Sequence, residues 1–219
     1  MPKITIDLVE RGTNANVSLW RISESEEELL SQKPFLQQYV VEMENMKSSA
    51  RRLEYLVTRA LLYDAVGEAG RIFHYPTGKP YLQDGRNISI SHTKGYVAIA
   101  VSKEYNVALD MEYVSDRVCR VADKFLRSDE NAETTLQKLL VWCAKETLYK
   151  LHSEDNLTFH EMRVEDVPEV KEHVFGELYI ENIRRNKQVK VAFIVTEGFI
   201  LAFAKEKHCL LYTSPSPRD

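Results

Sequence analysis

The sequence contains only three cysteines in 219 residues, and no two of them are closely spaced. They are Cys119, Cys143 and Cys209. Structural zinc sites and disulfide frameworks place cysteines at short, recurrent spacings, so the sequence predicts neither kind of site. So few cysteines, without a disulfide pattern, are typical of a reducing compartment, and we expect a cytoplasmic protein.

Long apolar runs are also missing. No stretch approaches the roughly 20 consecutive apolar residues that a membrane-spanning helix needs, so we expect no membrane partner. The opening residues, MPKITIDLVERG, alternate apolar and polar side chains and carry charges early. This alternation predicts a first β-strand and not a signal peptide.

An excess of positive charge is absent as well. Lysine and arginine number 29 against 33 aspartate and glutamate residues, which gives a formal net charge of −4. Domains whose main partner is nucleic acid are usually strongly basic, so the charge balance argues against that class. The hydrophobic content of 44% is enough for one large core or two small ones.

Helical and extended periodicities divide the remaining chain. We predict α-helices over residues 48–67, 115–130 and 134–152, and a shorter helical segment from Ser23 that Pro34 interrupts. Residues 88–113 alternate β-forming side chains with two breaks, which predicts a three-stranded meander. Residues 157–204 are also β-rich. The Ser/Pro-rich end, residues 209–219, has no periodicity and is predicted to be a disordered or non-native tail.

An internal similarity points to duplication. The segment TKGYV at 93–97 resembles TEGFI at 196–200, and each joins two apolar strands downstream of a long amphipathic helix. We therefore expect an α+β fold with two pseudo-symmetric lobes, residues 1–104 and 105–208. Each lobe would be a small antiparallel sheet packed on a long helix, with the active site between the lobes. The alternative is two unrelated hairpins with similar turn chemistry.

Two carboxylates interrupt the apolar strand ALDMEY. Asp110 and Glu112 are two residues apart, so they face the same side of a strand, about 7 Å apart. They repel each other unless a positive charge lies between them, and a divalent cation with oxygen ligands would supply that charge. The alternative is an edge strand with a solvated acidic face.

The predicted helix 134–152 carries a third candidate carboxylate in WCAKETLYK. Glu146 and Lys150 are four residues apart, a spacing at which a surface ion pair supports a helix. The other interpretation makes Glu146 a third ligand of the cation and lets Lys145 and Lys150 meet phosphate groups.

Further side chains of the kinds that bind phosphate occur in three segments: the turn GKPYL, the strand end SISHT and the helix ARRLEYLVTRALL. They are Lys79, Ser91, His92, Thr93, Arg52 and Arg59, with Arg51 as an alternative to Arg52. Each type is also common in structural or solvated positions, so no one segment identifies a site.

The order GKPYL, SISHT, ALDMEY and WCAKETLYK, near these separations, resembles the 4′-phosphopantetheinyl transferase superfamily. The length and the internal similarity resemble its two-lobed branch, which serves surfactin-type peptide synthetases. The resemblance covers residues 51–150. It implies transfer of the 4′-phosphopantetheine arm of coenzyme A to a serine of an apo acyl or peptidyl carrier protein, with release of 3′,5′-ADP. The family usually has glycine at Ala108, and we expect only a slight change in packing there.

The resemblance also implies roles for individual residues. Asp110, Glu112 and Glu146 would bind Mg²⁺, Glu146 would act as the catalytic base, and Lys150 would assist the leaving group. Coenzyme A would be held by the remaining phosphate-binding candidates: Lys79, Ser91, His92, Thr93, Arg52, Arg59 and Lys145.

A carrier protein is acidic around its acceptor serine, so a net acidic enzyme needs a local basic surface to bind one. The predicted helix 115–130 offers a stripe of four basic residues, Arg117, Arg120, Lys124 and Arg127, or simply a solvated face. We expect a monomer. Two other functions stay open: a non-catalytic relative that binds coenzyme A or carrier protein, and another Mg²⁺-dependent nucleotide phosphohydrolase.

Overall fold

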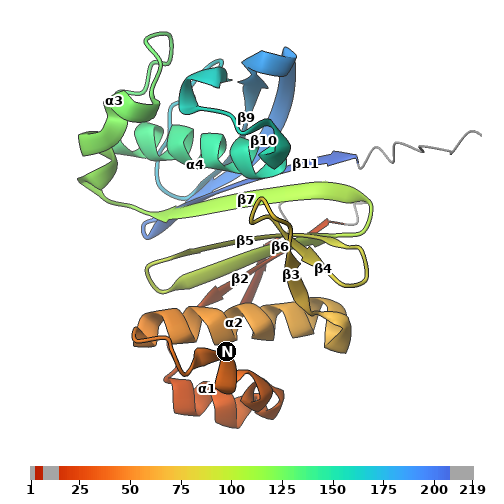
Figure 1. The fold of residues 1–219 in the computed structure, drawn as a ribbon. Coiled ribbons are helices and arrows are strands. Elements are labelled where there is room, and N and C mark those ends of the chain that lie inside the picture. Colours follow the sequence, from red (N-terminus) through yellow and green to blue (C-terminus); the bar gives the residue numbers. More distant parts are fainter. Residues whose placement is uncertain (1–2, 7–14, 208–219) are drawn as a thin grey trace, which may run out of the picture.

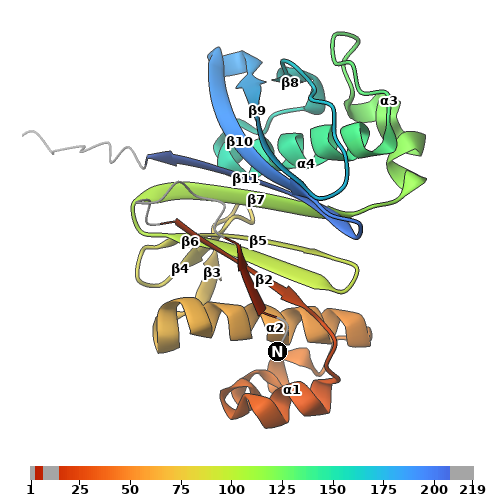
Figure 2. The ribbon, with the colours of Figure 1, turned by 180° about the vertical axis from the view of Figure 1, so that it is seen from behind.

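The computed structural model describes residues 3–6 and 15–207, in which two antiparallel sheets lie face to face between two long helices (Figures 1 and 2). Helix α2 (Ser49–Val66) covers the outer face of the first sheet, and helix α4 (Thr135–Leu151) covers that of the second. The predicted α+β class is therefore confirmed. The predicted tail, with Cys209, lies outside the described residues. Among the described helices, none combines the length and apolarity that a bilayer crossing requires.

The strand order is β1-β2-β6-β5-β4-β3 in the first sheet and β7-β11-β10-β9-β8 in the second, and all paired strands are antiparallel. The strands are β1 Lys3–Ile6, β2 Ala15–Arg21, β3 Ile72–His74, β4 Pro80–Leu82, β5 Asn87–Thr93, β6 Tyr96–Ser102, β7 Tyr105–Tyr113, β8 Met162–Val164, β9 Val174–Asn182, β10 Lys187–Val195 and β11 Phe199–Lys207.

The remaining helices are short. The α-helices are α1 Glu26–Gln32 and α3 Ala122–Phe125, and the 3₁₀ helices are η1 Pro34–Tyr39, η2 Val41–Met43, η3 Gly67–Ala69, η4 Asp116–Val121, η5 Ser153–Asp155, η6 Phe159–Glu161 and η7 Ile183–Arg185.

Local sequence accounts for where the main helices begin and end. The hydroxyls of Ser48 and Thr134 accept hydrogen bonds from the first turns of α2 and α4, which satisfies backbone donors that have no partner within the helix. Helix α2 ends at Gly67, whose φ of 69° suits glycine far better than a residue with a side chain. The predicted helices 48–67 and 134–152 are confirmed.

Two predictions about 88–130 are wrong. Strand β7 does not continue the β5–β6 hairpin as a meander but pairs with β11 in the second sheet, with Asp110 opposite Ala202. β7 carries apolar side chains on both faces, so it needs cover on both sides, which a meander edge would not provide. The predicted helix 115–130 is instead the 3₁₀ helix η4 followed by the four-residue helix α3.

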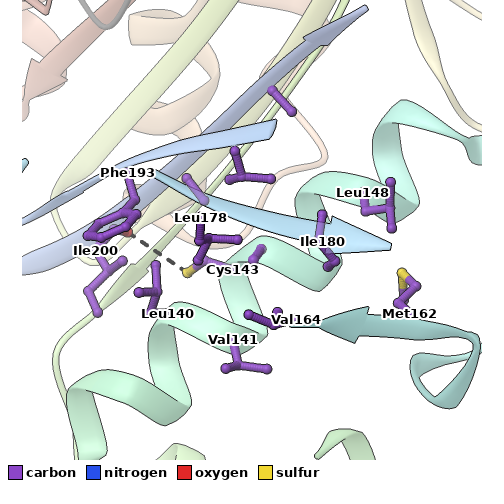
Figure 3. Packing of buried hydrophobic residues seen from close by; sticks show 14 of the residues in the cluster. Leu140, Val141, Cys143, Leu148, Met162, Val164, Leu178, Ile180, Phe193 and Ile200 are labelled. Carbon is purple, nitrogen blue, oxygen red and sulfur yellow. Dashed lines mark hydrogen bonds between the residues drawn. The ribbon is translucent and has the colours of Figure 1, made fainter. Parts of the chain in front are cut away.

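The core consists of three apolar layers. One lies between α2 and the first sheet, and another lies between α4 and the second sheet. Figure 3 shows the latter, where Leu140 and Cys143 of α4 lie against Leu178 and Ile180 of β9. The third layer joins the two sheets and includes Leu19, Leu109 and Phe203. Because this layer is buried between the sheets, it holds the two sheets against each other.

Three hydroxyls of β5 join it to the edge of β7, and we call this row the hydroxyl seam. Each hydroxyl accepts a hydrogen bond from a backbone N–H of β7: Ser89 from Leu109 (3.0 Å), Ser91 from Met111 (3.1 Å) and Thr93 from Tyr113 (2.9 Å). Side chains thus satisfy backbone donors that a neighbouring strand would otherwise pair. The seam brings β7, with Asp110 and Glu112, directly beside a strand of the first sheet.

Candidate functional site

Asp110 and Glu112 face helix α4. Along β7, Leu109 and Met111 lie in the layer between the sheets, whereas Ala108 lies in the layer under α4. Side chains alternate along a strand, so Asp110 and Glu112 share the α4 side with Ala108. The shared face that the sequence predicts for the two carboxylates is present.

Asp110 uses one of its two carboxylate oxygens and leaves the other without a partner. Its Oδ1 accepts hydrogen bonds from Lys150 Nζ at 2.7 Å and from Ser91 Oγ at 3.1 Å. Its Oδ2 is buried and has no hydrogen-bond partner within the described residues. A buried carboxylate oxygen without a partner is unfavourable, which points to a group that the chain itself does not supply.

Glu112 and Glu146 add negative charge beside Asp110. Burial, and then the charge of Asp110, raises the pKa of Glu112, while a hydrogen bond from the Trp142 side chain and the charge of Lys150 lower it. The same two causes raise the pKa of Glu146 to about 6, against the lowering effect of Lys150. The three carboxylates, which we call the carboxylate cluster, therefore repel one another, and Lys150 compensates only part of this charge.

The carboxylate cluster fits a hard divalent cation by its chemistry. It offers oxygen ligands only, one of them buried without a partner, which is the donor set that Mg²⁺ prefers. The carboxylate oxygens of Asp110, Glu112 and Glu146 do not all lie within 4.8 Å of one another. One group of described residues meets that distance: the ligand atoms of the exposed Glu172, His173 and Glu197. Glu172, His173 and Glu197 are all exposed, and exposed acidic groups of this kind are common without a bound ion.

A cavity of about 250 Å³ lies next to the cluster and is lined from both sheets. Lys79 enters it from the turn after β3, where Gly78 has a φ of 85°, and Tyr149 and Lys150 enter from α4. Burial lowers the pKa of Lys79, an effect that the charge of Glu154 opposes. Since Lys150 also binds Asp110, it links this cavity to the carboxylate cluster.

The side chains of the predicted phosphate-binding residues Ser91, His92 and Thr93 lie on two faces of β5. The hydroxyls of Ser91 and Thr93 point to β7 in the hydroxyl seam. His92 lies on the opposite face, where its Nδ1 is 3.4 Å from a carboxylate oxygen of Glu54 on α2, and its side chain is 46% exposed. The structure thus brings Ser91 to the cluster but not His92.

Arg52 and Arg59 lie on the outer side of α2. Arg52 donates two hydrogen bonds to Glu26 of α1. Arg59 lies over the ring of Tyr55, 3.2 Å from its centroid, and lines a separate hollow with Tyr39. Helix α1 packs on the side of α2 away from the sheets (Figure 1). The structure does not bring either arginine together with Lys79 or the carboxylate cluster.

Lys145 has a structural position, which corrects the predicted phosphate contact. Its side chain is 0% exposed, as is that of Glu130. Its Nζ donates to Glu130 at 2.7 Å and to the carbonyls of Phe125 and Phe159 at 2.7 and 3.2 Å. All three donors of the ammonium group are therefore used inside the protein, and none is free for coenzyme A.

The predicted basic stripe is split, because the segment 115–130 is not one α-helix. Arg117 and Arg120 are three residues apart in η4, which places them on one side of a 3₁₀ helix. They line a groove of about 380 Å³ together with Glu112 and Trp142. Arg127 instead binds Asp129 and the carbonyl of His160, and Lys124 is exposed on α3.

The sequence interpretation missed two contributors to the site. Trp142 donates a hydrogen bond to Glu112, and Tyr149 lines the cavity with Lys79. The spacing of Trp142, Glu146 and Lys150, each four residues from the next, could have identified Trp142, since all three then lie on one side of the helix.

Comparison with known proteins adds no relative. Neither a scan against models of protein families nor a search of curated proteins finds a match to this chain.

Proposed function

We propose that this chain transfers the 4′-phosphopantetheine arm of coenzyme A to a serine of an apo acyl or peptidyl carrier protein, releasing 3′,5′-ADP. One observation carries the proposal. The buried, partner-free oxygen of Asp110 lies in a carboxylate cluster that Lys150 connects to a cavity containing Lys79. The motif order in the sequence supports the same reaction. We expect a monomeric enzyme of the cytoplasm.

Asp110, Glu112 and Glu146 would hold the metal. When bound, Mg²⁺ would neutralise the negative charge that grows during phosphoryl transfer. The free Oδ2 of Asp110 and the raised pKa values of Glu112 and Glu146 are the features that support this assignment, because a cation relieves all three unfavourable charges at once.

Glu146 would accept the proton of the attacking carrier serine. Its pKa of about 6 leaves it ionised at neutral pH, yet basic enough to take a proton as the hydroxyl attacks phosphorus. Lys150 would stabilise the charge that develops on the departing 3′,5′-ADP, and Lys79 would hold phosphate in the cavity. For the 3′-phosphate we favour Arg51, which is exposed and lies one turn before Glu54, the partner of His92.

The proposal is tested by incubating the chain with coenzyme A, Mg²⁺ and an apo carrier protein. We expect the carrier to gain the mass of the arm, and Asp110→Asn to lose this activity while keeping the circular dichroism spectrum of the parent. Intact-protein mass spectrometry and the release of 3′,5′-ADP measure the two products. Release of a nucleotide without carrier modification would support the phosphohydrolase instead. Binding of coenzyme A without either product would support the non-catalytic relative.

Arg117 and Arg120 are the proposed docking residues for the acidic carrier, because both line the groove beside Glu112. Reversing both charges (Arg117→Glu with Arg120→Glu) is expected to raise KM for the carrier at least about tenfold and to leave KM for coenzyme A unchanged. The matched control is Arg127→Glu, whose partners are Asp129 and a carbonyl. Equal effects of the double change on both substrates would contradict this surface.

We also propose that the two halves are copies of one unit. In each unit a strand is followed by the long helix and then four strands, and the orders β2-β6-β5-β4-β3 and β7-β11-β10-β9-β8 correspond. The pairing registers correspond as well: Trp20 pairs with Val97 in the first sheet, and Glu112 pairs with Ile200 in the second. Such agreement supports the duplication that TKGYV and TEGFI suggest.

A further inference from the structure

We propose that Ser91 is a positioning residue that orients the Asp110 carboxylate and so keeps its Oδ2 available to a metal ion. The inference rests on the proposed function, because it concerns the same metal site. It assigns to the first sheet a part in metal binding, although the three carboxylates all belong to β7 and α4.

The Ser91 hydroxyl is fixed at both ends. It is 7% exposed, accepts a hydrogen bond from the N–H of Met111 at 3.1 Å and donates one to Asp110 Oδ1 at 3.1 Å. A serine hydroxyl has a single proton, so donating it to Asp110 excludes any other acceptor. The bond from Met111 holds the oxygen in place, and both contacts are to β7.

The Asp110 carboxylate is therefore clamped from two sides through the same oxygen. Ser91 reaches Oδ1 from the first sheet, and Lys150 reaches it from α4. Ser91 and Lys150 both bind Oδ1, and the buried Oδ2 has no hydrogen-bond partner among the described residues. Ser91 is neutral, so it fixes the orientation of the carboxylate without cancelling the negative charge that attracts a cation, which Lys150 does in part.

Ser89 provides the control that distinguishes the orienting of Asp110 from the loss of any hydrogen bond in the hydroxyl seam. Its hydroxyl accepts the N–H of Leu109 at 3.0 Å, much as Ser91 accepts that of Met111, and Ser89 is also buried. The bond between a hydroxyl of the seam and a carboxylate of the cluster is made by Ser91. Replacing Ser89 thus removes the structural contact alone, while replacing Ser91 removes both contacts.

The test is Mn²⁺ binding to the full chain, followed by electron paramagnetic resonance, with Mn²⁺ as an oxygen-binding substitute for Mg²⁺. We expect Ser91→Ala to raise the Kd for Mn²⁺ about 10- to 100-fold, the usual effect of losing a partner that orients a metal ligand. Ser89→Ala should keep the Kd of the parent. In urea Ser91→Ala should lose at least as much stability as Ser89→Ala, because it removes two hydrogen bonds and Ser89→Ala removes one. Ser91→Thr, which retains the hydroxyl, should restore the affinity.

The outcomes separate the two proposals. If the parent binds Mn²⁺ and the two alanine variants weaken binding equally, or neither does, Ser91 has no positioning role and the proposed function stands. If the parent binds no Mn²⁺, the metal site itself is wrong and this inference falls with it. Should Ser91→Ala fail to fold, Ser91→Cys serves instead, because a thiol keeps the volume and is a weaker donor. Parent affinity in that variant would overturn the role of Ser91.

Discussion

Replacing Glu146 by glutamine is expected to reduce carrier modification at least about 10²-fold and, in metal-free protein at pH 8, to raise the free energy of unfolding by about 1 kcal/mol. Under the proposed function, transfer falls because glutamine cannot accept the serine proton. Stability rises because burial and the charge of Asp110 raise the pKa of Glu146 to about 6, so its ionisation disfavours the folded state. The expected stabilisation of about 1 kcal/mol is kept small because the Glu146 side chain is partly exposed, and solvent weakens the repulsion.

The pH dependence of the gain in the free energy of unfolding shows whether the ionisation of Glu146 causes it. Below pH 4.5 Glu146 is protonated in both the folded and the unfolded protein, so the variant should gain nothing. The gain should appear between pH 4.5 and 6, where only the unfolded state ionises fully, and stay constant above that range. Urea unfolding in EDTA from pH 4 to 8 measures it. Glu133→Gln, an exposed carboxylate just before α4, is the control that should change neither activity nor stability.

A Glu146→Gln variant with near-normal turnover would exclude Glu146 as the base. A variant that is less stable than the parent at pH 8 would instead contradict the repulsion within the carboxylate cluster. Since the two measurements are independent, each part of the argument can fail alone.

Replacing Lys145 by methionine is expected to lower the free energy of unfolding by about 3–5 kcal/mol. The change leaves the Glu130 carboxylate charged in a site where both side chains are fully buried. Glu130 would keep the N–H groups of Arg127 and Val164 as donors but lose the ammonium group of Lys145, which lies 2.7 Å away. Urea unfolding at pH 7 measures the loss, which is large enough to leave part of the protein unfolded at 37 °C.

Two controls accompany this prediction. The double change Lys145→Met with Glu130→Gln removes both charges, so it should be more stable than Lys145→Met alone. Lys190→Met breaks an exposed pair with Glu177 and should cost less than about 1 kcal/mol. Transfer activity per folded molecule should survive in the double variant, because Lys145 contacts Glu130 and backbone carbonyls. A loss of activity without a loss of stability would return Lys145 to the coenzyme A site.

Sequence periodicity predicted the elements whose signals are local. Helices α2 and α4 have capping residues and a continuous apolar side, and both were predicted nearly to their ends. The partner of β7 could not be predicted in this way, because pairing with β11 joins residues far apart in the chain. The segment 115–130 has helical spacing, yet it folds mainly as a 3₁₀ turn around the buried Val118 and Phe125.

The candidate site was predictable where chemistry and spacing agree. The alternation of ALDMEY predicted that Asp110 and Glu112 share one face of a strand. The spacing of four residues predicted that Glu146 and Lys150 share one side of a helix. Adjacent residues misled the prediction where one faces the site and the next faces away. Lys145 precedes Glu146 but lies in the core, and His92 follows Ser91 but lies on the other side of β5. Burial, which depends on the whole fold, decides between such neighbours.

The pairing of β7 with β11 also determines when the site can exist during synthesis. Asp110 and Glu112 lie opposite Ala202 and Ile200, so their strand acquires its sheet only after nearly a hundred further residues have been made. Until then the ribosome-bound chain carries an acidic strand without the strand that pairs with it, and an unpaired strand edge favours aggregation and chaperone binding. A nascent chain stalled before Phe199 would contain every carboxylate of the cluster and still lack the strand that pairs with β7.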